Sequence, residues 1–162
     1  MAKEIERKFL LAAGTSIPIP EQFMKVKIKQ GYIHVGQSEQ SRIRITSWGG
    51  QEFSSICVKY TSNLVRDEFE FSVSNNKEAK GLYKKCKWTL EKKRLSFNSH
   101  VLPKVHYDVD TFPNGMQWVE VEFKSIKQMK VWEKKIPHWI GQEITGVSKY
   151  SNIALAKQNL KF

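Results

Sequence analysis

The chain has 162 residues, and its 27 lysines and arginines outnumber its 16 aspartates and glutamates, which gives a formal net charge of +11. Two cysteines are too few for a disulfide scaffold or a cysteine-based zinc site, and no apolar stretch is long enough to cross a bilayer. We therefore expect one domain, residues 1–162, in a cytoplasmic protein without a membrane segment. The excess positive charge indicates anionic partners such as nucleic acid, anionic lipid or a small polyphosphate, and charge alone favours nucleic acid.

Alternation of charged and apolar residues predicts strands along most of the chain. The expected strands are residues 4–11, 25–35, 41–47, 53–60, 65–73, 89–97, 104–112 and 116–124. Turns are expected at Gly49-Gly50, at Asn63 and at Pro113-Asn114-Gly115, because glycine and asparagine readily adopt the positive φ of tight turns.

Helical spacing of apolar residues occurs in three segments. The first is residues 75–88, with Asn75 or Asn76 as its N-cap, and the second is residues 125–135, which begins at Ser125 and stops before Pro137. The third is residues 148–159, and residues 136–145 are expected to be irregular. The sequence thus predicts an α+β protein of about eight strands, largely antiparallel hairpins, with three helices.

Six strands carry charged residues two positions apart, nearly all of one sign within a strand. These pairs are Glu4/Glu6, Arg42/Arg44, Glu68/Glu70, Lys92/Arg94, Asp108/Asp110 and Glu120/Glu122. For any single pair, a solvated strand face is the ordinary interpretation. If about eight antiparallel strands instead close into a β-barrel with this face inside, the interior is a charged tunnel and the helices cover the apolar outer face.

A tunnel with charges of both signs suits a polyphosphate bound together with a divalent metal ion. Arginine and lysine side chains match phosphate oxygens. Clustered carboxylates would repel the same phosphates unless they held Mg²⁺ or Mn²⁺ between themselves and the ligand. A nucleic-acid surface would need the bases without the acids, so nucleic acid is the less expected ligand of these strands.

The segment Glu4-Ile5-Glu6-Arg7-Lys8 resembles the E-x-E-x-K signature of the CYTH superfamily, the triphosphate tunnel metalloenzymes. Other segments that match this family, in family order, are Gln30-Gly31-Tyr32, Arg42-Ile43-Arg44, Val58-Lys59, Arg66 with Glu68 and Glu70, Lys92 with Arg94, Asp110-Thr111-Phe112, Glu120-Val121-Glu122, and Ile144-Thr145-Gly146 with Tyr150-Ser151-Asn152. The resemblance covers almost the whole chain and is closest to short, single-domain bacterial members. It implies an eight-stranded antiparallel tunnel that binds a triphosphate and uses a divalent metal to hydrolyse or rearrange it.

The resemblance also implies roles for individual residues. The implied metal ligands are Glu4, Glu6, Asp110, Glu120 and Glu122. The implied phosphate contacts are Lys8, Arg42, Arg44, Lys59, Arg66, Lys92, Arg94 and Lys149. Lys8 and Tyr32 are expected to act together near the scissile phosphate, with Glu4 and Glu6 as further catalytic residues. Glu68 and Glu70 fit either metal binding or a structural role in ordering the bases through ion pairs.

Two features depart from the family pattern. Many relatives have Gly-Asp before a final basic residue, where this chain has Gly146-Val147-Ser148-Lys149, and Asp108 is an added acid that can simply be exposed. The leading hypothesis is a Mg²⁺- or Mn²⁺-dependent triphosphatase acting on inorganic tripolyphosphate. Adenylate cyclase and thiamine triphosphatase are alternatives on the same fold, and a non-catalytic polyphosphate or nucleic-acid binding module is an alternative of another class. A homodimer is also possible.

Overall fold

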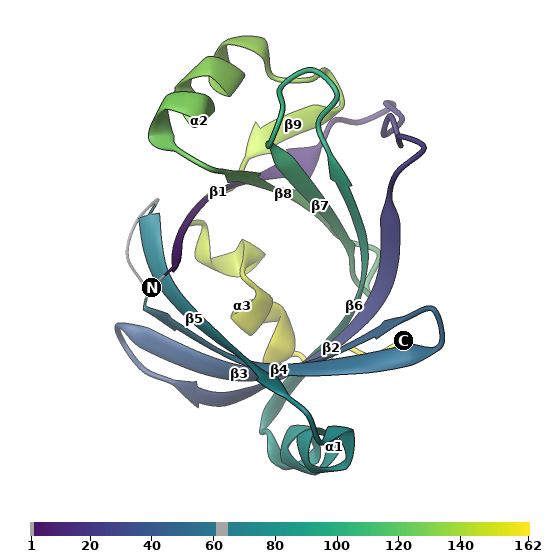
Figure 1. Ribbon diagram of the computed structural model, residues 1–162, viewed down its shortest axis with the longest axis vertical. Helices are drawn as coiled ribbons and strands as arrows, with labels where there is room; N and C mark the ends of the chain where they lie inside the picture. The colour runs from purple at the N-terminus through teal and green to yellow at the C-terminus, as the bar shows by residue number, and fades with distance from the viewer. Residues whose placement is uncertain (1, 61–64) are drawn as a thin grey trace.

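The computed structural model describes residues 2–60 and 65–162, and its main element is a closed antiparallel barrel (Figure 1). The turn predicted at Asn63 lies outside the described residues. The barrel strands are β1 (Ala2–Leu11), β2 (Met24–Val35), β3 (Glu39–Trp48), β4 (Gln51–Tyr60), β5 (Val65–Val73), β6 (Trp88–Asn98), β7 (His106–Thr111) and β8 (Gln117–Phe123). The predicted eight-stranded barrel is therefore confirmed, and its strand boundaries differ from the sequence prediction by a few residues.

Strand β1 closes the barrel because it pairs with strands from both ends of the sheet. The sheet order is β5-β4-β3-β2-β6-β7-β8-β1, and β5 also pairs with β1. The register places Glu4 opposite Arg66 of β5 and Lys8 opposite Glu120 of β8. A short ninth strand, β9 (Ile140–Glu143), adds to the last residues of β1. All of these pairings are antiparallel, as the run of hairpins in the sequence predicts.

Two helices lie on the outside of the barrel, and each begins at a side-chain cap. In α1 (Asn76–Lys85), the Asn75 side chain accepts hydrogen bonds from two backbone amides of the first turn. In α2 (Ile126–Trp132), the Ser125 side chain accepts one from Gln128 N at 3.1 Å. The short helix η1 (Glu133–Lys135) extends α2 and ends before Pro137. Such caps satisfy amide groups that have no partner within the helix.

The third helix, α3 (Asn152–Ala156), lies at one end of the barrel interior, where Figure 1 shows it through the opening. Leu155 and Ala156 pack against Leu90, Phe112 and Trp118, which are buried side chains of the strands and the turn after β7. Leu90 lies two residues before Lys92, and Trp118 lies two residues before Glu120, so these apolar residues face the inside as the charged ones do. The expectation that all three helices cover the outer face is wrong for α3.

The outer apolar face of the barrel is a separate core. It gathers residues of β1, β7 and β8 such as Phe9, Val109 and Val121 beneath Trp132 of α2 and Trp139. Because successive side chains of a strand point to opposite faces, the molecule has an outer apolar core under α2, a charged barrel interior, and a second apolar cluster that packs against α3. No helix in the described ranges has the length and apolar character needed to span a membrane.

Three local predictions are wrong. Residues 136–145 are not irregular throughout, because β9 pairs with β1. The predicted helix 148–159 is a 3₁₀ turn, η2 (Ser148–Tyr150), followed by the five residues of α3, because Ser151 is extended and its side chain caps a new helix start at Ala154 N. Helix α1 ends at Lys85 rather than at residue 88, since Cys86 has an extended backbone that leads into β6.

Candidate active site in the barrel interior

The barrel holds a cavity of about 490 Å³ whose wall consists mainly of charged side chains. Among the described residues, seven cationic and seven anionic side chains line it. They are Lys3, Lys8, Arg42, Arg44, Lys59, Arg66 and Arg94, and Glu4, Glu6, Glu68, Glu70, Asp108, Glu120 and Glu122. Most of them occupy alternate positions of their strands, which is why a period of two in the sequence places them on one wall.

One group of ion pairs joins β1 to β4 and β5. Lys59 Nζ lies 2.8 Å from Glu4 Oε2 and 2.9 Å from Glu68 Oε2. Arg66 Nη2 lies 3.3 Å from Glu6 Oε1. The Glu68 carboxylate also accepts a hydrogen bond from the Cys57 thiol at 3.0 Å. These side chains are mostly buried, so they are screened far less by salt than surface pairs and they fix the position of β1 against β5.

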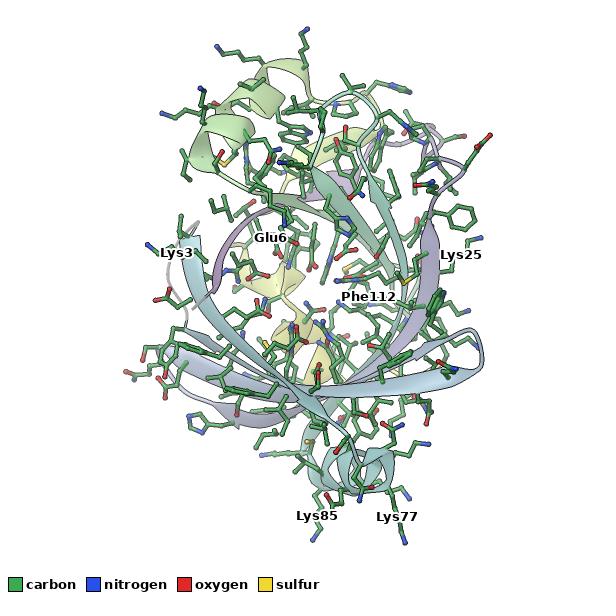
Figure 2. All side chains as sticks on the ribbon, viewed as in Figure 1. Lys3, Glu6, Lys25, Lys77, Lys85 and Phe112 are labelled. Carbon is green, nitrogen blue, oxygen red and sulfur yellow. The ribbon has the colours of Figure 1, made fainter. Side chains whose placement is uncertain are left out.

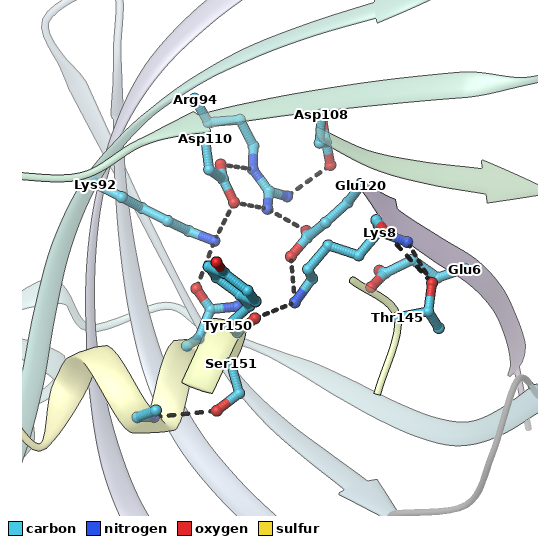
Figure 3. A network of polar contacts seen from close by, with 12 residues as sticks. Glu6, Lys8, Lys92, Arg94, Asp108, Asp110, Glu120, Thr145, Tyr150 and Ser151 are labelled. Carbon is cyan, nitrogen blue, oxygen red and sulfur yellow. Dashed lines mark hydrogen bonds and ion pairs between the residues drawn. The ribbon is translucent and has the colours of Figure 1, made fainter. Parts of the chain in front are cut away.

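A second group centres on Arg94, whose guanidinium donates to three carboxylates (Figure 3). It donates to both oxygens of Asp110, at 2.7 and 2.8 Å, to Asp108 at 2.6 Å and to Glu120 at 2.7 Å. Lys92 Nζ lies 2.6 Å from Asp110 Oδ2, and neither side chain is exposed. Four of the five N–H donors of Arg94 are therefore occupied by protein carboxylates.

Arg42 and Arg44 differ from Arg94 in having no carboxylate partner. The Nε atoms of both are buried without a hydrogen-bond partner, and neither guanidinium forms an ion pair with any carboxylate in residues 2–60 or 65–162. Burial and the neighbouring charges of Arg42 and Arg94 lower the pKa of Arg44 to about 10. Burial also acts to lower the pKa of Arg42, but the nearby Tyr32, Cys57, Glu68 and Glu120 raise it above its usual value. A buried cation with little compensation is costly, so an anion in the cavity would stabilise Arg44 in particular.

The carboxylates of β1 and β8 form the opposite part of the wall. Glu6 lies opposite Glu122 in the register of the two strands. Burial, followed by the nearby charges of Glu120 and Glu4, raises the pKa of Glu6 to about 7. A divalent cation would relieve this repulsion, and carboxylate oxygens are the ligands that Mg²⁺ and Mn²⁺ prefer, so the donor set fits such an ion. Within the described residues, no three acidic, histidine or cysteine side chains already surround a common point, because several of these carboxylates are held by lysine or arginine.

Comparison with known proteins identifies the family of this chain. No family model matches the sequence. A protein named inorganic triphosphatase from Acetivibrio thermocellus is 30% identical over 166 residues, covering 99% of this chain and 97% of that protein. The chain belongs to the CYTH superfamily.

Solved structures agree with this CYTH assignment. The crystal structure of the inorganic triphosphatase NE1496 superposes with a TM-score of 0.61 at 27% identity, covering 97% of this chain and 96% of that one. HpAC1 from Hippeastrum, a proposed adenylyl cyclase in which triphosphatase activity is dominant, superposes with a TM-score of 0.59 at 14% identity, covering 98% and 97% of the two chains. The second likeness concerns the fold alone.

Most residues that the CYTH resemblance singles out lie on the cavity wall, but three do not. Lys92 and Asp110 lie behind the wall as a buried ion pair. Lys149 is exposed on η2, with its Nζ 4.9 Å from the centre of the Tyr150 ring. Glu122 does line the cavity, but its side chain is 44% exposed and lies 3.9 Å from Lys124 Nζ.

Lys8 and Tyr32 both reach the cavity, from β1 and β2. Lys8 Nζ lies 3.5 Å from Glu120 Oε1, donates to the Tyr150 carbonyl at 3.3 Å and lies over the Trp118 ring at 4.6 Å. The hydroxyl of Tyr32 accepts from Gln30 Nε2 at 3.4 Å, and burial raises the pKa of Tyr32. The CYTH signature lysine thus lies between the carboxylates of β8 and the residues that precede α3.

Sequence reasoning assigned no function to several residues of the wall. Asp108, for which an exposed position was one possibility, is largely buried and lines the cavity, held by Arg94, by Ser96 Oγ at 2.5 Å and by His106 Nε2 at 3.1 Å. Its spacing of two from Asp110 was the available signal, since it places both carboxylates on one strand face. Asn152 of α3 also lines the cavity, and its side-chain oxygen accepts from Lys92 Nζ at 3.2 Å.

Proposed function

We propose that this chain is an inorganic triphosphatase that hydrolyses tripolyphosphate inside the barrel with the help of Mg²⁺ or Mn²⁺. The observation that carries the proposal is the enclosed cavity with its matched cationic and anionic walls, in a chain similar over its full length to a protein named inorganic triphosphatase. Phosphoryl transfer needs mainly positioning and charge neutralisation, and fixed cations in an enclosed site supply both.

Arg42 and Arg44 are the principal phosphate contacts in this proposal. Their guanidiniums lack carboxylate partners, and their orphaned Nε atoms point to a ligand that supplies acceptor oxygens. Arginine binds phosphate oxygens in a bidentate manner, so two neighbouring arginines on β3 can fix the orientation of a phosphate chain. Lys8, Lys59 and Arg66 add positive charge from the facing strands.

Lys92 and Arg94 have a different task from the phosphate contact predicted for them. Their donors are already directed at Asp110, Asp108 and Glu120, so they hold these carboxylates in place. Glu68 similarly holds Lys59, while Glu70 accepts a hydrogen bond from Ser55 at 2.7 Å. Lys149 is assigned no part in the reaction because it is exposed away from the cavity lining.

The residues that would hold a divalent cation in this proposal are Glu4, Glu6, Glu120 and Glu122, with Asp110 behind them. When bound, the cation would neutralise charge on the phosphate oxygens and lower the pKa of a water molecule. Lys8, which lies beside Glu120, and Tyr32 both line the cavity, and we assign to them the donation of hydrogen bonds to phosphate oxygens. Charge interactions between the buried groups of the cavity are stronger than they would be in bulk water, because the effective dielectric constant is lower inside a protein.

The test is release of inorganic phosphate from tripolyphosphate with Mg²⁺, with Mn²⁺ and with excess EDTA, in parallel with ATP and thiamine triphosphate. We expect tripolyphosphate to be the best substrate and EDTA to abolish turnover. Glu120→Gln should lose metal-dependent turnover, whereas Glu78→Gln, on α1 and away from the cavity, should retain it. Turnover that survives both EDTA and Glu120→Gln would contradict the proposal, and cyclic AMP formed from ATP would indicate a cyclase instead.

A further inference from the structure

The positive charge of this chain lies outside the barrel cavity. The cavity wall has equal numbers of cationic and anionic side chains, and the buried Lys92–Asp110 pair behind it also cancels. The formal charge of +11 is therefore carried by the other residues of the chain. A triphosphate in the cavity leaves this excess unexplained, and an outer surface of this sign attracts anionic ligands.

Two lysines on the outer face of β2 and β6 lie in an arrangement that the fold itself does not favour. Lys27 of β2 is directly opposite Lys93 of β6, and Lys25 is the next outward residue along β2 (Figure 2 shows Lys25 projecting from the barrel). Like charges directly opposite one another destabilise a sheet. No carboxylate of the described ranges forms an ion pair with Lys25, Lys27 or Lys93. An anion between the two facing lysines would remove the repulsion.

These lysines border an outer groove of about 640 Å³. Its wall includes the apolar side chains of Leu95 and Val109, and the indole of Trp48 stands at its edge. Trp48 ends β3 at the tip of the β3–β4 hairpin and is 51% exposed. Gly49 and Gly50 follow with φ of 57° and 78°, a left-handed turn that glycine adopts without strain. A half-exposed indole beside lysines combines a stacking surface with positive charge.

We propose that this groove binds a nucleotide, with its phosphate on Lys27 and Lys93 and its base stacked on Trp48. The volume falls within the range of roughly 300–1,000 Å³ that is usual for small-molecule sites. The lysines without a carboxylate partner form a short row, because the next outward residue of β2, Lys29, lies 3.8 Å from Glu91 Oε1. Lys93 Nζ lies 4.4 Å from the centre of the Phe162 ring, and Lys25 Nζ lies 5.4 Å from that of Phe23. A short row suits one or two phosphates rather than a long polyanion. Arg94 borders both this groove and the barrel cavity, but the lysines and Trp48 of the groove are absent from the cavity lining, and the site does not depend on the proposed hydrolysis.

The experiment is equilibrium dialysis of labelled AMP against the full chain without added metal. We expect about one AMP bound per chain. The double variant Lys27→Gln/Lys93→Gln and the single variant Trp48→Ala should each lower the affinity for AMP roughly tenfold or more. A charge-assisted phosphate contact and a stacked base each contribute on that scale. The matched control is Lys77→Gln/Lys85→Gln, which removes the same charge from α1, where both side chains project away from the barrel (Figure 2). The variant Arg42→Ala, which removes an arginine of the cavity wall, tests whether AMP binds in the cavity instead of the groove.

The proposal predicts unchanged AMP affinity in the α1 control. It is overturned if AMP does not bind, or if Arg42→Ala abolishes binding while the groove variants retain it, because AMP would then occupy the cavity. Adenosine binding as tightly as AMP would exclude the phosphate contact and overturn it as well. An oligothymidine that binds more than tenfold tighter than AMP would identify the surface as a nucleic-acid site and reject the nucleotide assignment.

Discussion

Lys92 and Asp110 form an ion pair of 2.6 Å in which neither side chain is exposed to solvent. The pair joins β6 to β7 behind the cavity wall, and Asp110 also receives two hydrogen bonds from Arg94. Burial lowers the pKa of Lys92 to about 8, with a further contribution from the charge of Arg94, so the carboxylate of Asp110 is needed to keep this lysine charged. The wall of the cavity therefore depends on a charge pair that no ligand can reach.

Removing one member of this pair should destabilise the fold. Asp110→Asn leaves Lys92 and Arg94 without their shared carboxylate, and breaking a buried ion pair typically costs about 3–5 kcal/mol. Urea denaturation of the purified variants is the measurement. Asp67→Asn, at an outward position of β5 and without an ion pair in the described residues, should change the free energy of unfolding by less than about 0.5 kcal/mol. Equal stability of the two variants would refute the role given to Asp110.

Arg44→Ala should weaken substrate binding more than it slows turnover. If its guanidinium binds phosphate, its loss removes charge-assisted hydrogen bonds, and KM for tripolyphosphate should rise roughly tenfold or more. Steady-state kinetics with saturating metal measure this change. Lys149→Ala provides the comparison, since Lys149 is exposed outside the cavity lining and should keep the KM of the wild type. A larger effect of Lys149→Ala than of Arg44→Ala would reverse the two assignments.

Asp108→Asn should lower turnover while leaving substrate affinity nearly unchanged. Asp108 holds one edge of Arg94, and Arg94 in turn holds Glu120. Loss of a residue that orients a metal ligand typically costs about 10–100-fold in activity or metal affinity. We expect kcat to fall within this range and the metal concentration for half-maximal activity to rise, with KM for tripolyphosphate changed by less than about twofold, since phosphate binding is assigned to other residues. Asp108→Glu, which keeps the charge, should restore part of the loss.

Two glycine-to-alanine changes should have opposite effects on stability. A Cβ added to Gly31 on β2 would lie 2.7 Å from Cys86 Sγ and 2.8 Å from Cys86 Cβ, so part of the chain must shift. Such overpacking costs about 1–3 kcal/mol. Gly81, in the exposed middle of α1, has nothing within 4 Å of the added Cβ, and alanine there should stabilise the helix by about 0.5–1 kcal/mol. Thermal denaturation of both variants tests this prediction, which fails if Gly31→Ala melts at or above the wild-type temperature.

The sequence was sufficient to predict the barrel because charge and apolar character alternate with a period of two in nearly every strand. That period places Glu4 and Glu6 on one face and Phe9 on the other, and strand pairing then allows few alternatives. Helix starts were also predictable where a cap is present, as at Asn75 and Ser125. These features depend on local chemistry, which a single sequence contains.

Other features depend on contacts between distant residues and could not be predicted. The division of cationic residues into those with carboxylate partners, such as Arg94, and those without, such as Arg44, follows from which strands face one another across the barrel. The short length of α3 and its place inside the barrel follow from its packing on Phe112 and Trp118. The strand β9 has only four residues, and it is ordered by the free edge of β1 rather than by a pattern of its own.

Strand β1 carries the E-x-E-x-K residues and also completes the hydrogen-bonded ring, since it pairs with both β5 and β8. The carboxylates and the lysine of this motif meet their partners only when segments about 60 and 115 positions later in the chain are in place. A chain in which the ring had not yet closed would thus have the β3 arginines that we propose to bind phosphate, but the carboxylates proposed to hold a cation would not yet face them. Catalytic competence and circular closure of the sheet are consequently acquired in the same event.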